Sequence, residues 1–123
     1  MPWGSTSFAV AVFLGGGTGS LLRYMLALWV AGRFSSPFGT LAANLCATAL
    51  LAIFTLMTAT RLPPGHWAVG LIAIGLCGGF STFSTFSADT WKLIAAGQPI
   101  WAALNVAISL IGCLAVYAAI SRF

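Results

Sequence analysis

Long apolar stretches alternate with short polar segments along this chain. The apolar stretches cover residues 8–30, 39–59, 66–96 and 100–120, and the segments between them contain proline, glycine or charged residues. A helix needs roughly 20 apolar residues to cross a bilayer. The pattern therefore predicts an all-α membrane protein, with residues 1–123 forming a single four-span domain. Since the loops are short, neighbouring helices are expected to pack antiparallel.

The third stretch is interrupted by a polar and aromatic segment that runs from Gly78 to Ser87, GGFSTFSTFS. Glycines loosen a helix, and a break at membrane depth is tolerated only where the freed backbone lines a cavity or binds an ion. We therefore expect the third helix to be broken near Gly78–Ser81. The alternative is that the glycines only permit close helix packing, as Gly15-x-x-x-Gly19 would in the first span.

Composition places the protein in a bilayer. The chain is 60% hydrophobic and 5% charged, and its mean hydropathy is +1.03, whereas soluble domains carry about 25% charged residues. Four short helices do not easily enclose a cavity, so an oligomer is expected. The sequence has no nucleophile–base pair, no metal-binding cysteine or histidine spacing and no basic patch for nucleic acid, so it predicts neither an enzyme nor a nucleic-acid-binding protein.

The few charges are balanced between the two sides of the membrane. Arg33 and Lys92 fall on the side of the first and third loops, and Arg61 and Arg122 fall on the other side. Orientation follows an asymmetry of Lys and Arg between the two sides, and this chain has almost none. The balance favours a dual-topology protein that inserts both ways and pairs as an antiparallel homodimer.

Phenylalanine and hydroxyl side chains interleave in the third span. Phe80, Phe83 and Phe86 recur every three residues, with five Ser or Thr residues among them. The edge of an aromatic ring is electropositive and hydroxyls are donors, so the segment could line a path for an anion. Packing of the rings against lipid or the protein core is the simpler alternative.

Further polar residues occupy the other spans. Arg23 lies deep in the first span, where it could extend to the first-loop side and form a positive vestibule that attracts anions. Asn44 offers amide donors in the second span, although a lone Asn can also join helices. A stripe in the fourth span could serve packing or a pathway; it consists of Asn105, Ser109 and Cys113. No carboxylate lies mid-span, and the sole acid, Asp89, is expected near the third loop, so donors and positive charge favour an anion over a cation.

Three motifs in this order resemble the small fluoride channels of the Fluc (CrcB) family over nearly the whole sequence. They are Gly15-Gly16-Gly17-Thr18-Gly19 with Arg23-Tyr24, Phe38-Gly39-Thr40-Leu41 with Asn44, and Gly78 to Ser87. The resemblance implies a passive fluoride-selective channel of the bacterial cytoplasmic membrane, assembled as an antiparallel dual-topology homodimer with two pores. It also implies that fluoride leaves the cytoplasm through these pores, which lowers its toxicity.

The resemblance assigns roles to individual positions. It implies a structural sodium ion held by the backbone carbonyls of Gly78 and Ser81 from both subunits. It implies an ion pathway lined by Asn44, Phe83, Phe86, Asn105, Ser109 and Cys113. As hydroxyl donors of the same segment, Thr82 and Ser84 are expected to line this pathway as well. This sequence departs from the family pattern with Ser81 for threonine, Asp89 for glutamate, Asn105 for a tyrosine found in some relatives and Cys113 for serine.

A small four-span drug or cation exporter is the main alternative, because such proteins are also commonly dual-topology. It predicts a membrane-embedded carboxylate in the first span, and residues 8–30 contain none. A non-transporting subunit of a membrane complex would leave the polar segment of the third span unexplained.

Overall fold

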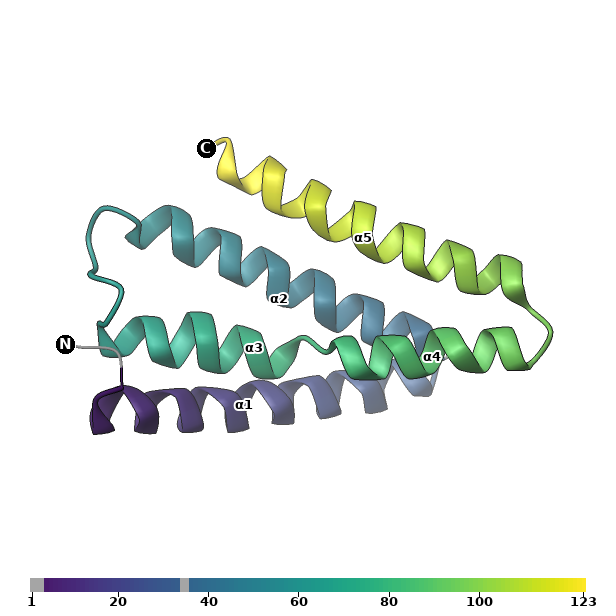
Figure 1. Ribbon diagram of the computed structural model, residues 1–123, viewed down its shortest axis with the longest axis horizontal. Helices are drawn as coiled ribbons and strands as arrows, with labels where there is room; N and C mark the ends of the chain where they lie inside the picture. The colour runs from purple at the N-terminus through teal and green to yellow at the C-terminus, as the bar shows by residue number, and fades with distance from the viewer. Residues whose placement is uncertain (1–3, 34–35) are drawn as a thin grey trace.

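A computed structural model describes residues 4–33 and 36–123, apart from the side chain of Ser36. Within these ranges the chain is helical and contains no strand. Its elements are α1 (Thr6–Ala31), α2 (Ser36–Thr58), a π-helix η1 (Val69–Leu76), α3 (Cys77–Phe80), α4 (Phe83–Ala95) and α5 (Pro99–Ser121) (Figure 1).

Four described segments are long and apolar enough to cross a membrane. They are Thr6–Ala31, Pro37–Thr58, Val69–Ala95 and Pro99–Ser121. The predicted four-span, all-helical class is therefore confirmed. The start of α1 and the end of α5 lie at the same end of the bundle (Figure 1), as an even number of spans requires.

Local sequence signals set the ends of these helices. The Ser5 hydroxyl accepts a hydrogen bond from the Phe8 N–H at 3.2 Å and caps α1, and Pro99 begins α5, where a missing N–H costs nothing. Gly97 ends α4 with φ of +76°. The Gly97 N–H bonds to the Ile94 carbonyl and the Gln98 N–H to the Leu93 carbonyl, which is the Schellman arrangement that favours glycine.

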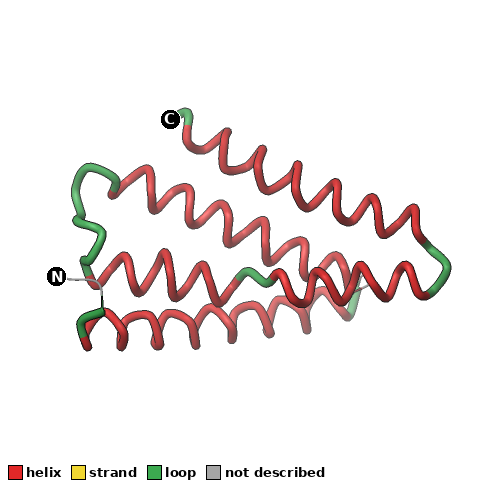
Figure 2. The backbone as a smooth tube through the Cα atoms, in the orientation of Figure 1, coloured by secondary structure: helices red, strands yellow, loops and turns green. Residues whose placement is uncertain are grey.

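Backbone contact between glycines joins the first and third spans. A Cβ added at Gly15 would clash with the Leu71 carbonyl oxygen, one at Gly19 with the Leu76 carbonyl oxygen, and one at Gly79 with the Gly16 carbonyl oxygen. Small residues allow membrane helices to approach this closely. Figure 2 shows α1 running alongside the third span, while α5 lies on the far side of α2.

The third span is broken between α3 and α4, as the sequence predicts. Ser81 (φ −82°, ψ 157°) and Thr82 (φ −153°, ψ 124°) are extended, and Figure 2 shows this break as a short loop inside the span. The break falls at the end of the predicted segment, because Gly78 and Gly79 are still helical. Gly79 therefore serves helix packing against α1, whereas an added Cβ at Gly78 would meet nothing within 4 Å. The two hydroxyl residues form the break.

The first eight residues of the third span form a π-helix, which the sequence pattern does not predict. Its wider turn is visible in the hydrogen bond from the Cys77 N–H to the Ile72 carbonyl, five residues back. Gly70 and Gly75 within it are buried, and a Cβ at Gly75 would lie 2.8 Å from the Val12 carbonyl oxygen. Hydropathy reports the length of a span and carries no signal for its winding.

Substitution of Gly19 by alanine should destabilise the bundle. Alanine is the better helix former by about 1 kcal/mol, but its methyl group would clash with the backbone of η1 and α3. We expect a net loss of at least about 2 kcal/mol, measured as a lower thermal midpoint in detergent. Gly17→Ala is the matched control, since nothing lies within 4 Å of its added Cβ. Equal midpoints for the two variants would contradict this account of the interface.

Candidate functional site

The break in the third span is held by the side chain of Asn44 on α2. The Thr82 N–H donates to Asn44 Oδ1 at 2.8 Å, and Asn44 Nδ2 donates to the Thr82 carbonyl at 3.3 Å. One side-chain amide thus satisfies both backbone polar groups of an extended residue. The second Nδ2 hydrogen remains a donor in the same region.

Arg23 reaches the break from the opposite side. Its Nε donates to the Gly79 carbonyl oxygen at 3.2 Å, and the residue is half-buried. The sequence suggested a side chain extended toward the first loop, whereas the structure directs it across to the end of α3. The positive charge therefore lies beside the break, and a role as a vestibule stays a prediction.

Side chains at the break divert two backbone donors. In a continuous helix the N–H groups of Thr82 and Thr85 would bond to the carbonyls of Gly78 and Ser81. Here the Thr82 N–H donates to Asn44, and the Thr85 N–H donates to the Thr82 hydroxyl at 3.2 Å. The carbonyls of Gly78 and Ser81 thereby lose the partners that helix continuation would give them.

An open cleft of about 250 Å³ lies beside the break, between α2, α4 and α5. It is lined by Asn44, Thr48, Ser81, Thr82, Phe83, Phe86, Ser109, Leu110 and Cys113. Six of the eight predicted pathway residues are therefore gathered on one surface, although they come from three helices. Thr48 and Leu110 also line the cleft and were not predicted. Thr48 lies four residues after Asn44, on the same helix face, whereas Leu110 directly follows Ser109 and has no comparable sequence signal.

Two phenylalanines form one wall of this cleft. The ring centroids of Phe83 and Phe86 are 5.6 Å apart and the ring planes are tilted by 39°. Phe83 is 76% exposed. A tilted pair presents ring edges as well as faces, and the edges carry the positive part of the quadrupole.

Ser109 contributes a hydroxyl without a protein partner. Among the described residues it is the one buried side-chain oxygen for which the structure shows no hydrogen bond, and the residue is 7% exposed. A buried hydroxyl without a partner costs roughly 1–3 kcal/mol. Such a group beside a cleft is suited to donate to a bound ion or water.

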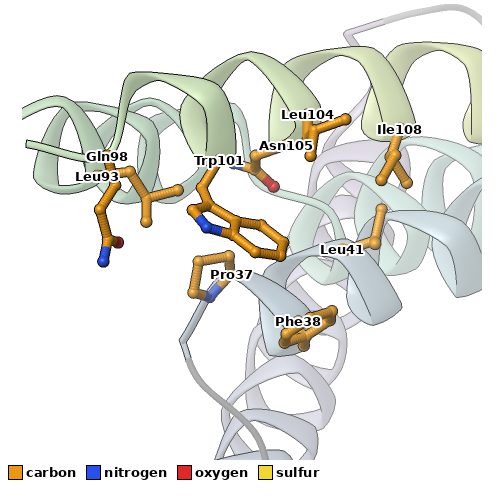
Figure 3. A pocket seen from close by; sticks show the side chains of 9 residues that line it. All are labelled: Pro37, Phe38, Leu41, Leu93, Gln98, Trp101, Leu104, Asn105 and Ile108. Carbon is orange, nitrogen blue, oxygen red and sulfur yellow. The ribbon is translucent and has the colours of Figure 1, made fainter.

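Two predicted pathway residues lie elsewhere. Asn105 donates from Nδ2 to the Thr90 hydroxyl at 3.0 Å and lines a separate, largely apolar cavity of about 390 Å³ near Trp101 and Pro37 (Figure 3). Ser84 is exposed on α4, and its hydroxyl lies 3.3 Å from that of Thr82. Their assignment to the pathway stays a prediction.

The sole carboxylate is buried within α4. Asp89 is 3% exposed and its Oδ2 accepts a hydrogen bond from the Thr40 hydroxyl at 2.8 Å. The sequence placed it near the third loop, whereas the helix continues past it to Ala95. Thr40 lies one helical turn before Asn44 on α2. The same face of α2 therefore forms hydrogen bonds to Asp89 on α4 and to Thr82 at the break.

Comparison with known proteins agrees with this arrangement. The profile of the family described as CrcB-like protein, Camphor Resistance (CrcB), matches residues 10–120. The chain belongs to the CrcB family. It is 48% identical over 108 residues to a protein of Cronobacter sakazakii named fluoride-specific ion channel FluC, covering 84% of this chain and 82% of that protein.

Two further relatives carry the same name. A protein of Escherichia fergusonii is 44% identical over 118 residues, which cover 89% of this chain and 87% of the relative. A protein of Rhodospirillum rubrum is 40% identical over 108 residues, which cover 84% of this chain and 83% of that relative. The similarity to members of the CrcB family thus extends over most of this chain in each case.

Replacing Asn44 by leucine should loosen the break while leaving the long helices in place. Leucine fills a similar volume but can neither donate to nor accept from Thr82, which leaves two partly buried backbone groups without this partner, at up to roughly 1–3 kcal/mol each. We expect faster hydrogen–deuterium exchange over residues 81–85, measured by mass spectrometry.

Thr58→Val is the control for this measurement, because the Thr58 hydroxyl bonds only within its own helix, to the Phe54 carbonyl at 2.6 Å. If the Asn44 and Thr58 variants exchange alike at the break, then Asn44 does not hold it.

Proposed function

We propose that this protein is a passive, fluoride-selective channel through which fluoride leaves the cytoplasm. The observation that carries the proposal is the cleft itself, where amide, hydroxyl and aromatic groups from three helices meet at the break of a membrane span. No acidic residue is among those that line it. The relatives named as fluoride-specific ion channels support the same function.

The lining suits a small and strongly hydrated anion. Such an ion leaves water only if the protein supplies matched donors in place of the hydration shell. Asn44 retains one amide hydrogen, Ser109 has a hydroxyl without a protein partner, and the Phe83 and Phe86 rings present edges. A larger anion would gain less from the same donors in a narrow path.

A cation or drug exporter is less well supported. Its mechanism needs a carboxylate that reaches the transported ion. Asp89 is the sole acid of the chain, it is bonded to the Thr40 hydroxyl, and it does not line the cleft.

An antiparallel homodimer would cover the exposed side of the break. Gly78, Ser84 and Ser87 are exposed there, as is the Phe83 ring. Hydroxyls and a broken backbone are costly against hydrocarbon, so a second copy is a better neighbour than lipid. The balanced Lys and Arg count of the two sides supports pairing of oppositely inserted copies.

A structural sodium ion fits the carbonyls of Gly78 and Ser81. Unwound carbonyls at membrane depth are common sodium ligands, and these two have lost their helical donors to Asn44 and to the Thr82 hydroxyl. The bound ion would supply a fixed positive charge near the cleft, while Asn44 and Thr82 orient the carbonyl-bearing backbone.

Fluoride efflux from liposomes tests the function directly. Purified protein should release trapped fluoride, measured with a fluoride electrode, and should not release chloride. Phe83→Ile should reduce the rate at least about tenfold, because an aliphatic side chain has no electropositive edge. Asn44→Asp should reduce it similarly, since a carboxylate can still accept from Thr82 but offers no donor and repels anions.

Phe13→Ile is the control, because Phe13 lies on α1 away from the cleft and is 78% exposed. Efflux no faster than that of protein-free vesicles, or equal chloride release, would overturn the channel. Normal efflux in both cleft variants would overturn the assignment of the pathway.

Insertion in both orientations predicts a divided population in cell membranes. With a protease-cleavable tag after Phe123, about half of the tags should be cleaved from outside inverted vesicles prepared from expressing cells, because neither orientation is favoured. The double variant Arg61→Gln/Arg122→Gln removes positive charge from one side, and this should move the fraction of cleaved tags away from one half. Complete cleavage or complete protection of the unmodified chain would show a single orientation.

A further inference from the structure

Of the three cysteine thiols of this protein, one lies in the cleft. Cys46 is exposed on α2 and Cys77 is buried at 3% exposure, and neither lines the cleft. Cys113 is partly exposed on α5 and lines the cleft together with Asn44, Phe83 and Phe86. A group attached to its sulfur would therefore occupy space that an ion must cross.

The surroundings of Cys113 can accept an added group. Ser109 lies one helical turn earlier on the same face of α5, lines the same cleft, and has a buried hydroxyl without a protein partner. The cleft volume of about 250 Å³ exceeds the share of a water molecule, about 30 Å³, several times over. There is thus both an unfilled hydrogen-bonding position and room next to the thiol.

We propose that Cys113 is a covalent modification site, at which small thiol-directed electrophiles close the anion cleft. This inference rests on the proposed function, because it assigns regulation to the same cleft. The cleft is open, and Asn44, Thr82 and Ser109 are among its lining residues, so a small reagent and the water that takes up the thiol proton have a path to the sulfur. Cys77 is packed inside the protein, and modification of Cys46 would add bulk outside the cleft.

Methyl methanethiosulfonate is a suitable probe. The Cys113 thiol gives its proton to water, and the thiolate attacks the methylthio sulfur of the reagent. A sulfur–sulfur bond forms to Cys113, the sulfur–sulfur bond of the reagent breaks, and methanesulfinate leaves. The adduct replaces an S–H donor with an apolar methylthio group among the donors of the cleft. Dithiothreitol reverses it by thiol–disulfide exchange.

Fluoride efflux before and after treatment tests the inference. Three proteins are compared, each against its own untreated rate: the unmodified chain, Cys46→Ala/Cys77→Ala, and Cys113→Ser. Treatment should slow efflux at least about tenfold in the first two, since the added group obstructs a narrow path, and dithiothreitol should restore it. Cys113→Ser should keep its untreated rate, and Cys113→Ala serves if the serine variant does not assemble.

Two results would overturn the inference. One is equal inhibition of the Cys113 variants, and the other is complete labelling of Cys113, shown by peptide mass mapping, with unchanged efflux. Failure of the proposed function is seen separately, as an absence of fluoride efflux before treatment. In that case the order of labelling still tests whether the Cys113 thiol lies in the cleft. A cleft-lining Cys113 must be labelled before the buried Cys77, and labelling of Cys77 first would refute this position of Cys113.

Discussion

Every structural feature of this protein depends on how a membrane span can be interrupted. Hydrocarbon offers no hydrogen bonds, so each backbone group freed by a break needs a partner within the protein. Three side chains meet this requirement for Thr82, Thr85 and Gly79: Asn44 pairs with Thr82, the Thr82 hydroxyl accepts from Thr85, and Arg23 donates to the Gly79 carbonyl. The carbonyls of Gly78 and Ser81 are those that the proposed sodium ion would bind. The break is thus a defined conformation, and the cleft beside it has a defined lining.

Helix packing places these partners where the break needs them. The glycines of α1 allow backbone contact with η1 and α3, and Arg23, one turn after Gly19, lies within reach of Gly79 for that reason. On the other side, Phe80 is buried against Ala43 and Ala47 of α2, which fixes α2 with Asn44 next to the extended residues. Small residues on two helices therefore determine the position of the polar contacts.

The sequence predicts the spans, the break and most of the cleft, because length, hydropathy and the unusual Ser, Thr and Phe content of one segment carry these signals. It does not predict relationships between helices. Asn105, Ser109 and Cys113 share one stripe of α5, yet Asn105 faces Thr90 on α4 while the other two face the cleft. The direction of Arg23 and the Thr40–Asp89 hydrogen bond likewise depend on which helix lies opposite, and hydropathy carries no signal for the winding of η1.

The placement of the break between two helices has an electrostatic consequence. A helix carries a partial negative charge at its C-terminal end and a partial positive charge at its N-terminal end. The break brings the end of α3 and the start of α4 together at Ser81 and Thr82, so one two-residue interruption presents both polarities inside the membrane. The guanidinium of Arg23 lies at the negative end, and Phe83 and the cleft begin at the positive end. A single kink can in this way favour positive charge at one of its two helix ends and negative charge at the other.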